Sequence, residues 1–559
     1  MQILIEGEYY PTEKLESLFD DPKFYKVNGQ EGTITSVGYY HSFSKNSLVF
    51  MLPKVFMEGD NQTVFKCNKE VLIDLIANES VKHKTEYNWV RQLSVYFYNS
   101  LIEYRRRRQQ SSIIHDTETF ELNTNLSEKE YSFLDLLLSF VNFYKRNRQQ
   151  ILFKYIEFIS GQAKKPKWEK TIQKSLPVIV NGGTPIYIEI SNKKKVFNTE
   201  EELIIYFFSI LNKLNVEHNL NLKIDRSYQI IDGCAFERLC ESGLSKLRKI
   251  KYRYFSDTLR RMYVLCEIYF TMFDKSSIRK KREDFLSISN YNLVFEDMVD
   301  KLFSDEESKL QVDGVSIDML KHNDDGKIID HIYDYESLID RSNIFYIGDS
   351  KYYKSDNAIG KVSKYKQFTY AKNVIQFNID ILNKVGEQQV IPLRYLDKVT
   401  EGYNLSPNFF IQGYVNDIDN YHDSMVSKQG EPIRSFHFQD RLFDRDTLFV
   451  HQYKINFLYV LKSYTAFNNS DIGDFRKDVR KKFRDNFLIF FNDKEACGFT
   501  FFQSTLSKDK HEEFVEKNFK KLNGKCFRTI EGKLILAVND VSLVNEEFSE
   551  YFEPMGKLY

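Results

Sequence analysis

The chain of 559 residues lacks several features that would place it in a common class. Its six cysteines form no CxxC pair, and none stands at zinc-like spacing from a histidine, which argues against a zinc module. Their sparseness is typical of a reducing compartment. The start of the chain has no signal-peptide pattern, and no apolar run is long enough to span a membrane. We therefore expect a cytoplasmic protein that does not contact a membrane.

Two nucleotide-binding motifs are also missing. The sequence has no GxxxxGK[ST] loop, so the chain is not expected to hydrolyse NTP by itself. It has no GxGxxG opening a strand–helix unit, which leaves a dinucleotide or methyl-donor fold without support. A modification enzyme is therefore disfavoured.

The chain has no net charge either, because 79 basic residues balance 79 acidic ones. This balance still permits a basic groove that acidic surfaces elsewhere offset. Two basic stretches stand out, namely Arg105, Arg106, Arg107 and Arg108, and the span from Lys246 to Arg282 with Lys249, Lys251 and Arg253. They indicate either contact with a DNA backbone or solvated helix faces. Tyr252 and Tyr254, among these bases, are candidates for stacking on bases or, as we favour, for core packing.

The length and the hydrophobic patterns predict a multidomain α+β protein. We expect a β-rich N-terminal domain over residues 1–75 and a mainly helical region over 76–285 that binds DNA or a partner. An α/β core with a mixed sheet follows over 286–400. Residues 401–559 form a further α/β region that either stands alone or completes this core.

Individual elements follow from the same patterns. Hairpins are expected where Gly38–Tyr40 precedes Ser47–Pro53 and where Leu176–Val180 precedes Ile186–Ile190. Phe487–Phe491 has the pattern of a strand. His451–Tyr464 has that of a helix, and Asp444 and Asp446 are placed to cap its start near Thr447.

One segment carries residues suited to chemistry. Leu293–Phe303 is an amphipathic helix, Lys327–Asp334 and Ile344–Tyr353 are extended, and a helix containing Tyr365–Ala371 follows. Asp349 and Lys351 end a strand that is otherwise apolar, where charges are costly to desolvate. Residues two apart on a strand share a face, so this carboxylate and ammonium project to one place. Asp330, or Asp334 as the second choice, reaches the same place from the neighbouring strand.

Each of these residue types suits the hydrolysis of a phosphodiester. Grouped carboxylates repel one another and bind a hard cation such as Mg²⁺, for which Mn²⁺ is an expected substitute. A cation held there neutralises phosphate charge and acidifies a bound water. Lys351 would orient or deprotonate that water and neutralise the transition state. Asp330 and Asp349 are therefore the expected metal ligands.

The arrangement resembles the PD-(D/E)xK nuclease superfamily, in which an acid on one strand precedes an acid-x-Lys triplet on the next. Asp349–Ser350–Lys351 matches the triplet and Asp330 the upstream acid, although Ile329 stands where that family has proline. The resemblance implies a catalytic role for Glu296 on the preceding helix. Gln367 lies where the following helix often carries a supporting polar residue. Glu296 also fits a helix-dipole role, and Gln367 an ordinary helix surface.

More narrowly, the chain is similar to LlaJI-type restriction endonucleases, relatives of the McrC nuclease subunit. The matching stretches are Val37–Tyr40, Leu52–Phe56, Ile347–Tyr353, Val399–Asn404 and Leu442–Leu448. The resemblance implies a type II-like restriction endodeoxyribonuclease of a bacterial anti-phage system. The implied partners are DNA and an AAA+ NTPase subunit of the McrB kind, with a second copy of the chain as a further candidate.

Rival interpretations stay open. An acid-x-Lys triplet arises by chance on the order of five to ten times at this composition, so its placement on a buried strand decides its weight. The alternative from another class is a non-catalytic DNA-binding or scaffold subunit with a nuclease-like fold. A nuclease that acts on RNA is a third interpretation.

Overall fold

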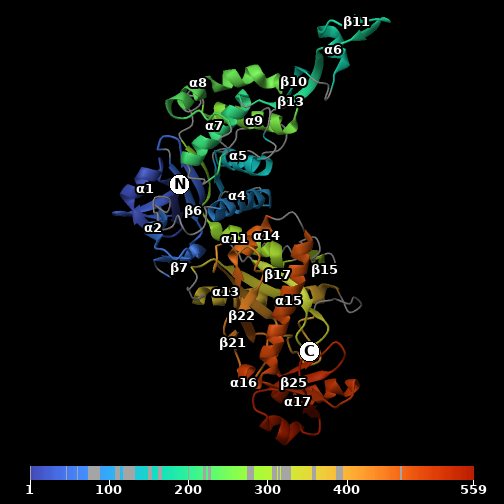
Figure 1. The fold of residues 1–559 in the computed structure, drawn as a ribbon. Coiled ribbons are helices and arrows are strands. Elements are labelled where there is room, and N and C mark those ends of the chain that lie inside the picture. Colours follow the sequence, from blue (N-terminus) through green and yellow to red (C-terminus); the bar gives the residue numbers. More distant parts are fainter. Residues whose placement is uncertain are drawn as a thin grey trace.

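The computed structural model describes most of the chain. The residues described are 2–45, 47–59, 61–73, 88–107, 114–116, 133–148, 151, 154–161, 166–198, 200–217, 222–224, 228–273, 283–304, 311–312, 315–316, 329–354, 360–385, 394–418, 420–465 and 469–558. The protein is a mixed α/β structure with several sheets. Figure 1 shows an elongated molecule with the hairpin that contains β11 (Val178–Val180) at one end and α17 (His511–Leu522) at the other.

The N-terminal part is rich in strands. A five-stranded sheet has the order β1-β6-β5-β14-β9 and consists of β1 (Gln2–Ile5), β6 (Ser47–Leu52), β5 (Val37–Ser42), β14 (Glu283–Ile288) and β9 (Ile114–Asp116). The predicted hairpin is confirmed, because β5 and β6 pair antiparallel from Ser42 opposite Ser47. A second sheet contains β2 (Tyr9–Pro11), β4 (Glu31–Ile34) and β3 (Tyr25–Asn28), beside α1 (Thr12–Leu18). β14 comes from the far side of the helical region, so one sheet joins segments that are distant in sequence.

Helices dominate the part between these strands and the central sheet. They are α2 (Lys69–Ile73), α4 (Asn88–Arg107), α5 (Phe133–Asn147), α7 (Glu202–Glu217), α8 (Gly233–Ile250) and α9 (Asp257–Met272). A two-stranded ribbon, β10 (Lys154–Gly161) with β13 (Ile190–Phe197), extends from them and carries α6 (Trp168–Lys174) and the hairpin of β11 and β12 (Thr184–Ile186) (Figure 1). This hairpin is the second one predicted. No helix in the described residues is both long and apolar enough to cross a bilayer.

A mixed sheet lies at the centre of the part that contains the candidate site. Its order is β17-β18-β19-β22-β20, and β21 also pairs with β22. The strands are β17 (His331–Glu336), β18 (Asn343–Lys351), β19 (Pro407–Tyr414), β22 (Leu448–Asn456), β20 (Val426–Lys428) and β21 (Ile433–Ser435). β18 pairs antiparallel with β17 and parallel with β19. Strands from both sides of residue 400 therefore share one sheet.

Helices cover both faces of this sheet, and this explains why most residues of β18 are apolar instead of alternating with polar ones. On one face Phe483 of α15 (Asn469–Asn492) packs on Phe409 of β19. On the other, Phe368 of α13 (Lys361–Val385) packs against Phe410 and Val450. α11 (Tyr291–Phe303) lies against β17, β18, α14 (Phe457–Tyr464) and α15.

A smaller sheet ends the chain. Its order is β24-β25-β23-β26, formed by β24 (Cys526–Arg528), β25 (Leu534–Val538), β23 (Thr500–Ser504) and β26 (Phe552–Pro554), with α16 (Lys494–Cys497) and α17 beside it. Short two-stranded pairs complete the described elements, β7 (Met57–Glu58) with β8 (Gln62–Thr63) and β15 (Gln311–Val312) with β16 (Val315–Ser316).

Two predictions of secondary structure were wrong. Phe487–Phe491 lies inside α15, where its phenylalanines bury one side of a helix that is otherwise highly charged. The run from Leu448 is a strand, and the helix begins only at Phe457, capped by Asn456. His451, which was expected in the first turn of this helix, is thus fully buried in β22. Pairing with β19 determines this strand, and the local pattern does not contain that information.

Gly348 in β18 is required by close packing. A Cβ built there would lie 2.2 Å from the ring of Phe409, which is fully buried and cannot move aside. We predict that Gly348→Ala lowers the free energy of unfolding by about 1–3 kcal/mol, measured by urea denaturation. The matched control is Gly473→Ala in α15, where a Cβ meets no atom within 4 Å. Equal stability of both variants would contradict this packing argument.

Candidate active site

The four residues expected to be catalytic meet at the carboxyl end of β18. Asp349 and Lys351 lie on that strand, and the Lys351 Nζ forms an ion pair with Asp349 Oδ2. Asp330 directly precedes β17, and its Oδ2 accepts a hydrogen bond from Ser350 N at 3.1 Å. Because His331 pairs with Gly348, extending the antiparallel register by one residue places Asp330 opposite Asp349. The structure thus brings Asp330 to the triplet.

Asp334 lies farther along β17 and does not join this group. It stands opposite Phe345 in the sheet, and its Oδ2 accepts a hydrogen bond from Asn343 Nδ2 at 3.1 Å. Four residues of extended chain separate it from Asp330, which is on the order of 13 Å. Between the two acids that the sequence left open, Asp330 is the one beside Asp349.

Glu296 reaches the same place from α11. Burial and the nearby Asp349 carboxylate raise the pKa of Glu296 to about 7, against a hydrogen bond from Asn292 and the charge of Lys351. Burial, Asp349 and Glu296 also raise the pKa of Asp330 well above its ordinary value. The Asp349 carboxylate is therefore close enough to both Glu296 and Asp330 to oppose their ionisation.

Gln367 is fully buried, contrary to the surface alternative. Its Nε2 donates to Ile347 O at 3.0 Å, and its Oε1 has no hydrogen-bond partner among the described residues. The amide thus ties α13 to β18 two residues before Asp349. It acts on the site by holding this strand in place.

A row of buried polar side chains, Asp300, His331 and Ser350, lies behind the site and was not predicted from the sequence. His331 Nε2 lies 2.5 Å from Ser350 Oγ, and its Nδ1 lies 3.6 Å from Asp300 Oδ1. The order Asp–His–Ser resembles a hydrolytic triad, but His331 is wholly buried and Ser350 nearly so, so no substrate reaches the hydroxyl. The sequence did contain a signal for this contact, because His331 directly follows Asp330 and Ser350 directly follows Asp349. Polar side chains on buried strands need hydrogen-bond partners, and these two could have been expected to provide them for each other.

A second feature that was missed ties the site to the N-terminal strands. Tyr352 OH donates to Glu6 Oε2 at 2.5 Å and accepts from Lys54 N at 3.2 Å. Lys354 Nζ forms an ion pair with Glu8 Oε1 at 2.5 Å. The partners are 298 to 346 residues apart in sequence, so no local sequence pattern could have predicted these contacts.

The basic residues proposed for DNA contact have different environments. Arg106 forms an ion pair with Glu103 at 2.8 Å. Arg107 forms an ion pair with the buried Asp297 at 2.8 Å, and Asp297 also accepts a hydrogen bond from Tyr464 OH at 2.6 Å. Arg107 thus neutralises a buried carboxylate, so its charge has a structural role.

The other basic residues proposed for DNA contact are exposed where the structure describes them. Arg105 is exposed, and Arg108 lies outside the described residues. Lys249, Lys251 and Arg253 are exposed at the end of α8.

His451 and the nearby Asp444 and Asp446 do not combine into a metal site. Burial and the charge of Lys428 lower the pKa of His451 to about 3, so the ring is neutral at ordinary pH. Asp446 Oδ1 pairs with Lys372 Nζ at 2.6 Å, and Asp444 Oδ1 accepts from Asp446 N at 2.9 Å. Both acids therefore have structural partners, although the helix that they were expected to cap does not begin there.

Among the described residues, no group of three or more His, Cys, Asp or Glu side chains is placed to hold a metal ion. Mg²⁺ does not require such a group, because it is usually held by one or two carboxylates together with water and substrate phosphate. Asp330 and Asp349 supply two such carboxylates, and the raised proton affinity of Asp330 would fall beside a cation. The residues fit Mg²⁺ in chemistry.

Comparison of the sequence with family models and with curated proteins finds no match in either.

The raised pKa of Glu296 makes stability depend on pH. Between the ordinary value of 4.5 and about 7, the folded chain holds a proton that the unfolded chain releases. The contribution to folding is therefore present below pH 4.5 and is lost as the pH rises through 7. We predict that Glu296→Gln reduces the stability difference between pH 5 and pH 8 by roughly 1–3 kcal/mol, measured by denaturant unfolding at both pH values.

The control is Glu513→Gln on α17, a fully exposed acid whose ion pair with Lys517 lowers its pKa. That variant should not reduce the difference between the two pH values. An unchanged pH dependence in Glu296→Gln would show that the carboxyl is not desolvated beside Asp349.

Proposed function

We propose that this chain is a Mg²⁺-dependent endonuclease that hydrolyses phosphodiester bonds in DNA. The single observation that supports it is the group formed by Asp330, Asp349, Lys351 and Glu296 at one end of a sheet covered on both faces. Burying three acids and an ammonium together is costly, and it contributes little to stability compared with an apolar replacement. Acids such as Glu296 and Asp330, whose pKa values are raised by burial and by a neighbouring carboxylate, are characteristic of functional sites.

Each side chain has a role in this proposal. Asp330 and Asp349 hold the cation, which supplies charge neutralisation at phosphorus and an acidified water. Lys351 Nζ, which contacts Asp349, orients or deprotonates the attacking water and stabilises the charge of the transition state. Glu296, with its pKa near neutrality, exchanges a proton with solvent at the working pH.

The choice of DNA and of a restriction system rests on the resemblance to LlaJI-type endonucleases. The exposed cations at the end of α8 support a polyanionic substrate. The non-catalytic scaffold remains the rival proposal. The presence of Asp330, Asp349, Lys351 and Glu296 in one largely buried group favours the enzyme, since a scaffold has no use for these charges.

Cleavage tests the proposal directly. Asp349→Asn and Lys351→Ala should each lower the rate of plasmid cleavage with Mg²⁺ by at least about 100-fold, because each removes a group that acts on the transition state. DNA affinity and thermal unfolding should change little. Asp334→Asn is the matched control. Asp334 lies on β17 and accepts a hydrogen bond from Asn343, which is at the opposite end of β18 from Asp349. Cleavage by both site variants at the wild-type rate would overturn the assignment.

We also propose an AAA+ NTPase as partner, bound at the hairpin of β11 and β12. This hairpin exposes an unusual set of apolar side chains, Leu176 (92% exposed), Ile179 (71%) and Ile188 (76%). It projects from the molecule on the β10–β13 ribbon (Figure 1). Several exposed apolar side chains on one hairpin are typical of protein interfaces.

Charge placed on the hairpin should therefore prevent docking. We predict that Leu176→Asp combined with Ile179→Asp lowers affinity for a candidate AAA+ ATPase by at least about tenfold in a pull-down titration. Val27→Asp, on the exposed face of β3, is the control for added charge. Wild-type affinity in the double variant would exclude the hairpin as the docking surface.

A further inference from the structure

A pair of aromatic rings is exposed just after α8. The helix ends at Ile250, and a 3₁₀ turn over Lys251–Arg253 follows. Tyr252 is 84% exposed and Phe255 80%, whereas Tyr254 between them is buried and donates a hydrogen bond to Glu201. Core packing is thus confirmed for Tyr254 and wrong for Tyr252. Two rings so fully in water serve no purpose in the fold.

Basic residues precede and flank these rings in the sequence. Five basic residues lie on the last turns of α8 and on the 3₁₀ turn, all exposed and none in an ion pair with a described residue: Lys246, Arg248, Lys249, Lys251 and Arg253. No acid occurs between Glu241 and Asp257. The segment therefore concentrates positive charge in a chain whose net charge is zero. Such a concentration favours a polyanion.

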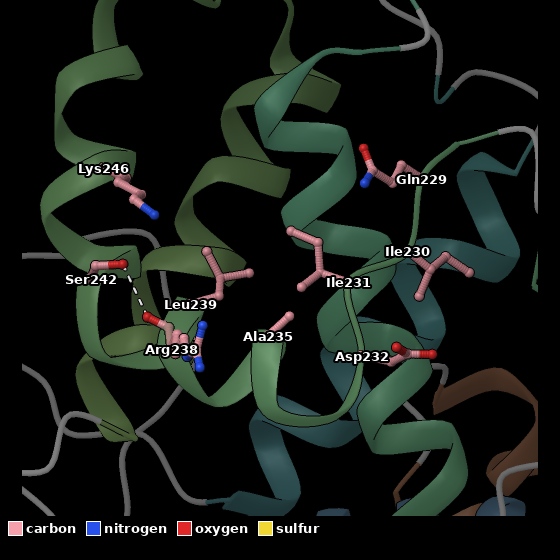
Figure 2. A pocket seen from close by; sticks show the side chains of 9 residues that line it. All are labelled: Gln229, Ile230, Ile231, Asp232, Ala235, Arg238, Leu239, Ser242 and Lys246. Atoms are coloured by element: carbon pink, nitrogen blue, oxygen red, sulfur yellow. Dashed lines mark hydrogen bonds between the residues drawn. The ribbon is translucent and has the colours of Figure 1, made fainter.

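A cavity adjoins this segment along the helix. Arg238, Ser242, Lys246 and Lys249 recur every three or four residues and so share one side of α8. The first three line a hollow of about 460 Å³ whose opposite wall is the segment from Gln229 to Asp232. Figure 2 shows Lys246 and Arg238 directed toward the hollow, with Ile231 across from them. Asp232, its one carboxylate, lies well apart from Lys246 in this view.

The lining of this cavity combines two kinds of surface. Ile230, Ile231 and Leu239 provide an apolar wall, and Arg238 and Lys246 provide charge. The volume lies within the range of ordinary small-ligand sites, so one nucleotide has room in it. From Arg238 to Lys249 the helix rises about 16 Å, which is a span of a few nucleotides.

We propose that this surface, formed by the cavity of α8 and the turn through Phe255, binds single-stranded DNA. The cations neutralise phosphates, and Tyr252 and Phe255 stack on bases. A duplex offers its bases no free faces for stacking, so the exposed rings select an unpaired strand. The choice of DNA as the polymer rests on the proposed function. The site itself is separate from the carboxylates around Asp349.

Binding without metal tests the inference independently of cleavage. The full chain is titrated into 5′-fluorescein oligo(dT), in EDTA, and anisotropy is recorded. Combining Tyr252→Ala with Phe255→Ala should weaken binding by about tenfold while leaving affinity for a duplex of equal length nearly unchanged. Combining Lys249→Ala with Lys251→Ala should reduce the slope of log affinity against log salt by roughly 0.7 per lysine.

Controls come from comparable exposed residues elsewhere. Tyr9→Ala, at a half-exposed tyrosine of β2, and Lys520→Ala, on α17, should both bind as the wild type does. Tyr252→Trp should retain binding, because the larger ring still stacks. An unchanged affinity in the aromatic variant, equal losses on single strand and duplex, or tighter binding of oligo(U) RNA than of oligo(dT) would each overturn the inference. Loss of plasmid cleavage by Asp349→Asn is expected in either case, so the two proposals fail separately.

Discussion

The structure depends most on the way four charged side chains are held at the end of a buried strand. β18 is covered on both faces, so any charge on it loses its hydration. Asp349 is compensated by Lys351, but Asp330 and Glu296 add two further acids without a second base in the group. The protein therefore retains an excess of acid in a place where water is scarce. A divalent cation would relieve that imbalance.

Three separate stretches of chain hold the strand that carries this group in position. Gln367 bonds the backbone of β18 from α13, and His331 meets Ser350 behind the strand. Beyond the strand end, Tyr352 contacts Glu6. The first strands of the protein are thus joined directly to the strand that carries the site. Because these bonds are buried, they constrain the carboxylates more than surface contacts would, and the geometry depends on the whole fold instead of one loop.

The surfaces away from the site differ in chemical character. The β11–β12 hairpin exposes apolar side chains, whereas the end of α8 combines exposed aromatic rings with cations that have no ion-pair partner among the described residues. An apolar projection suits a protein partner, and a basic aromatic surface suits a nucleic acid strand. Figure 1 shows that both belong to the helical part of the molecule, away from the central sheet. The proposed partner and the proposed substrate would therefore bind to different surfaces of the chain.

The sequence by itself determined the elements around the site and the pairing of Asp349 with Lys351, because a strand places alternate residues on one face whatever surrounds it. It did not determine whether Asp330 or Asp334 joins them, since that follows from the register between β17 and β18. Nor did it identify β22, which is a strand because it pairs with β19. The burial of Gln367 and the exposure of Tyr252 were likewise decided by packing between distant segments. Local periodicity specifies local geometry, and only tertiary contacts decide which faces meet.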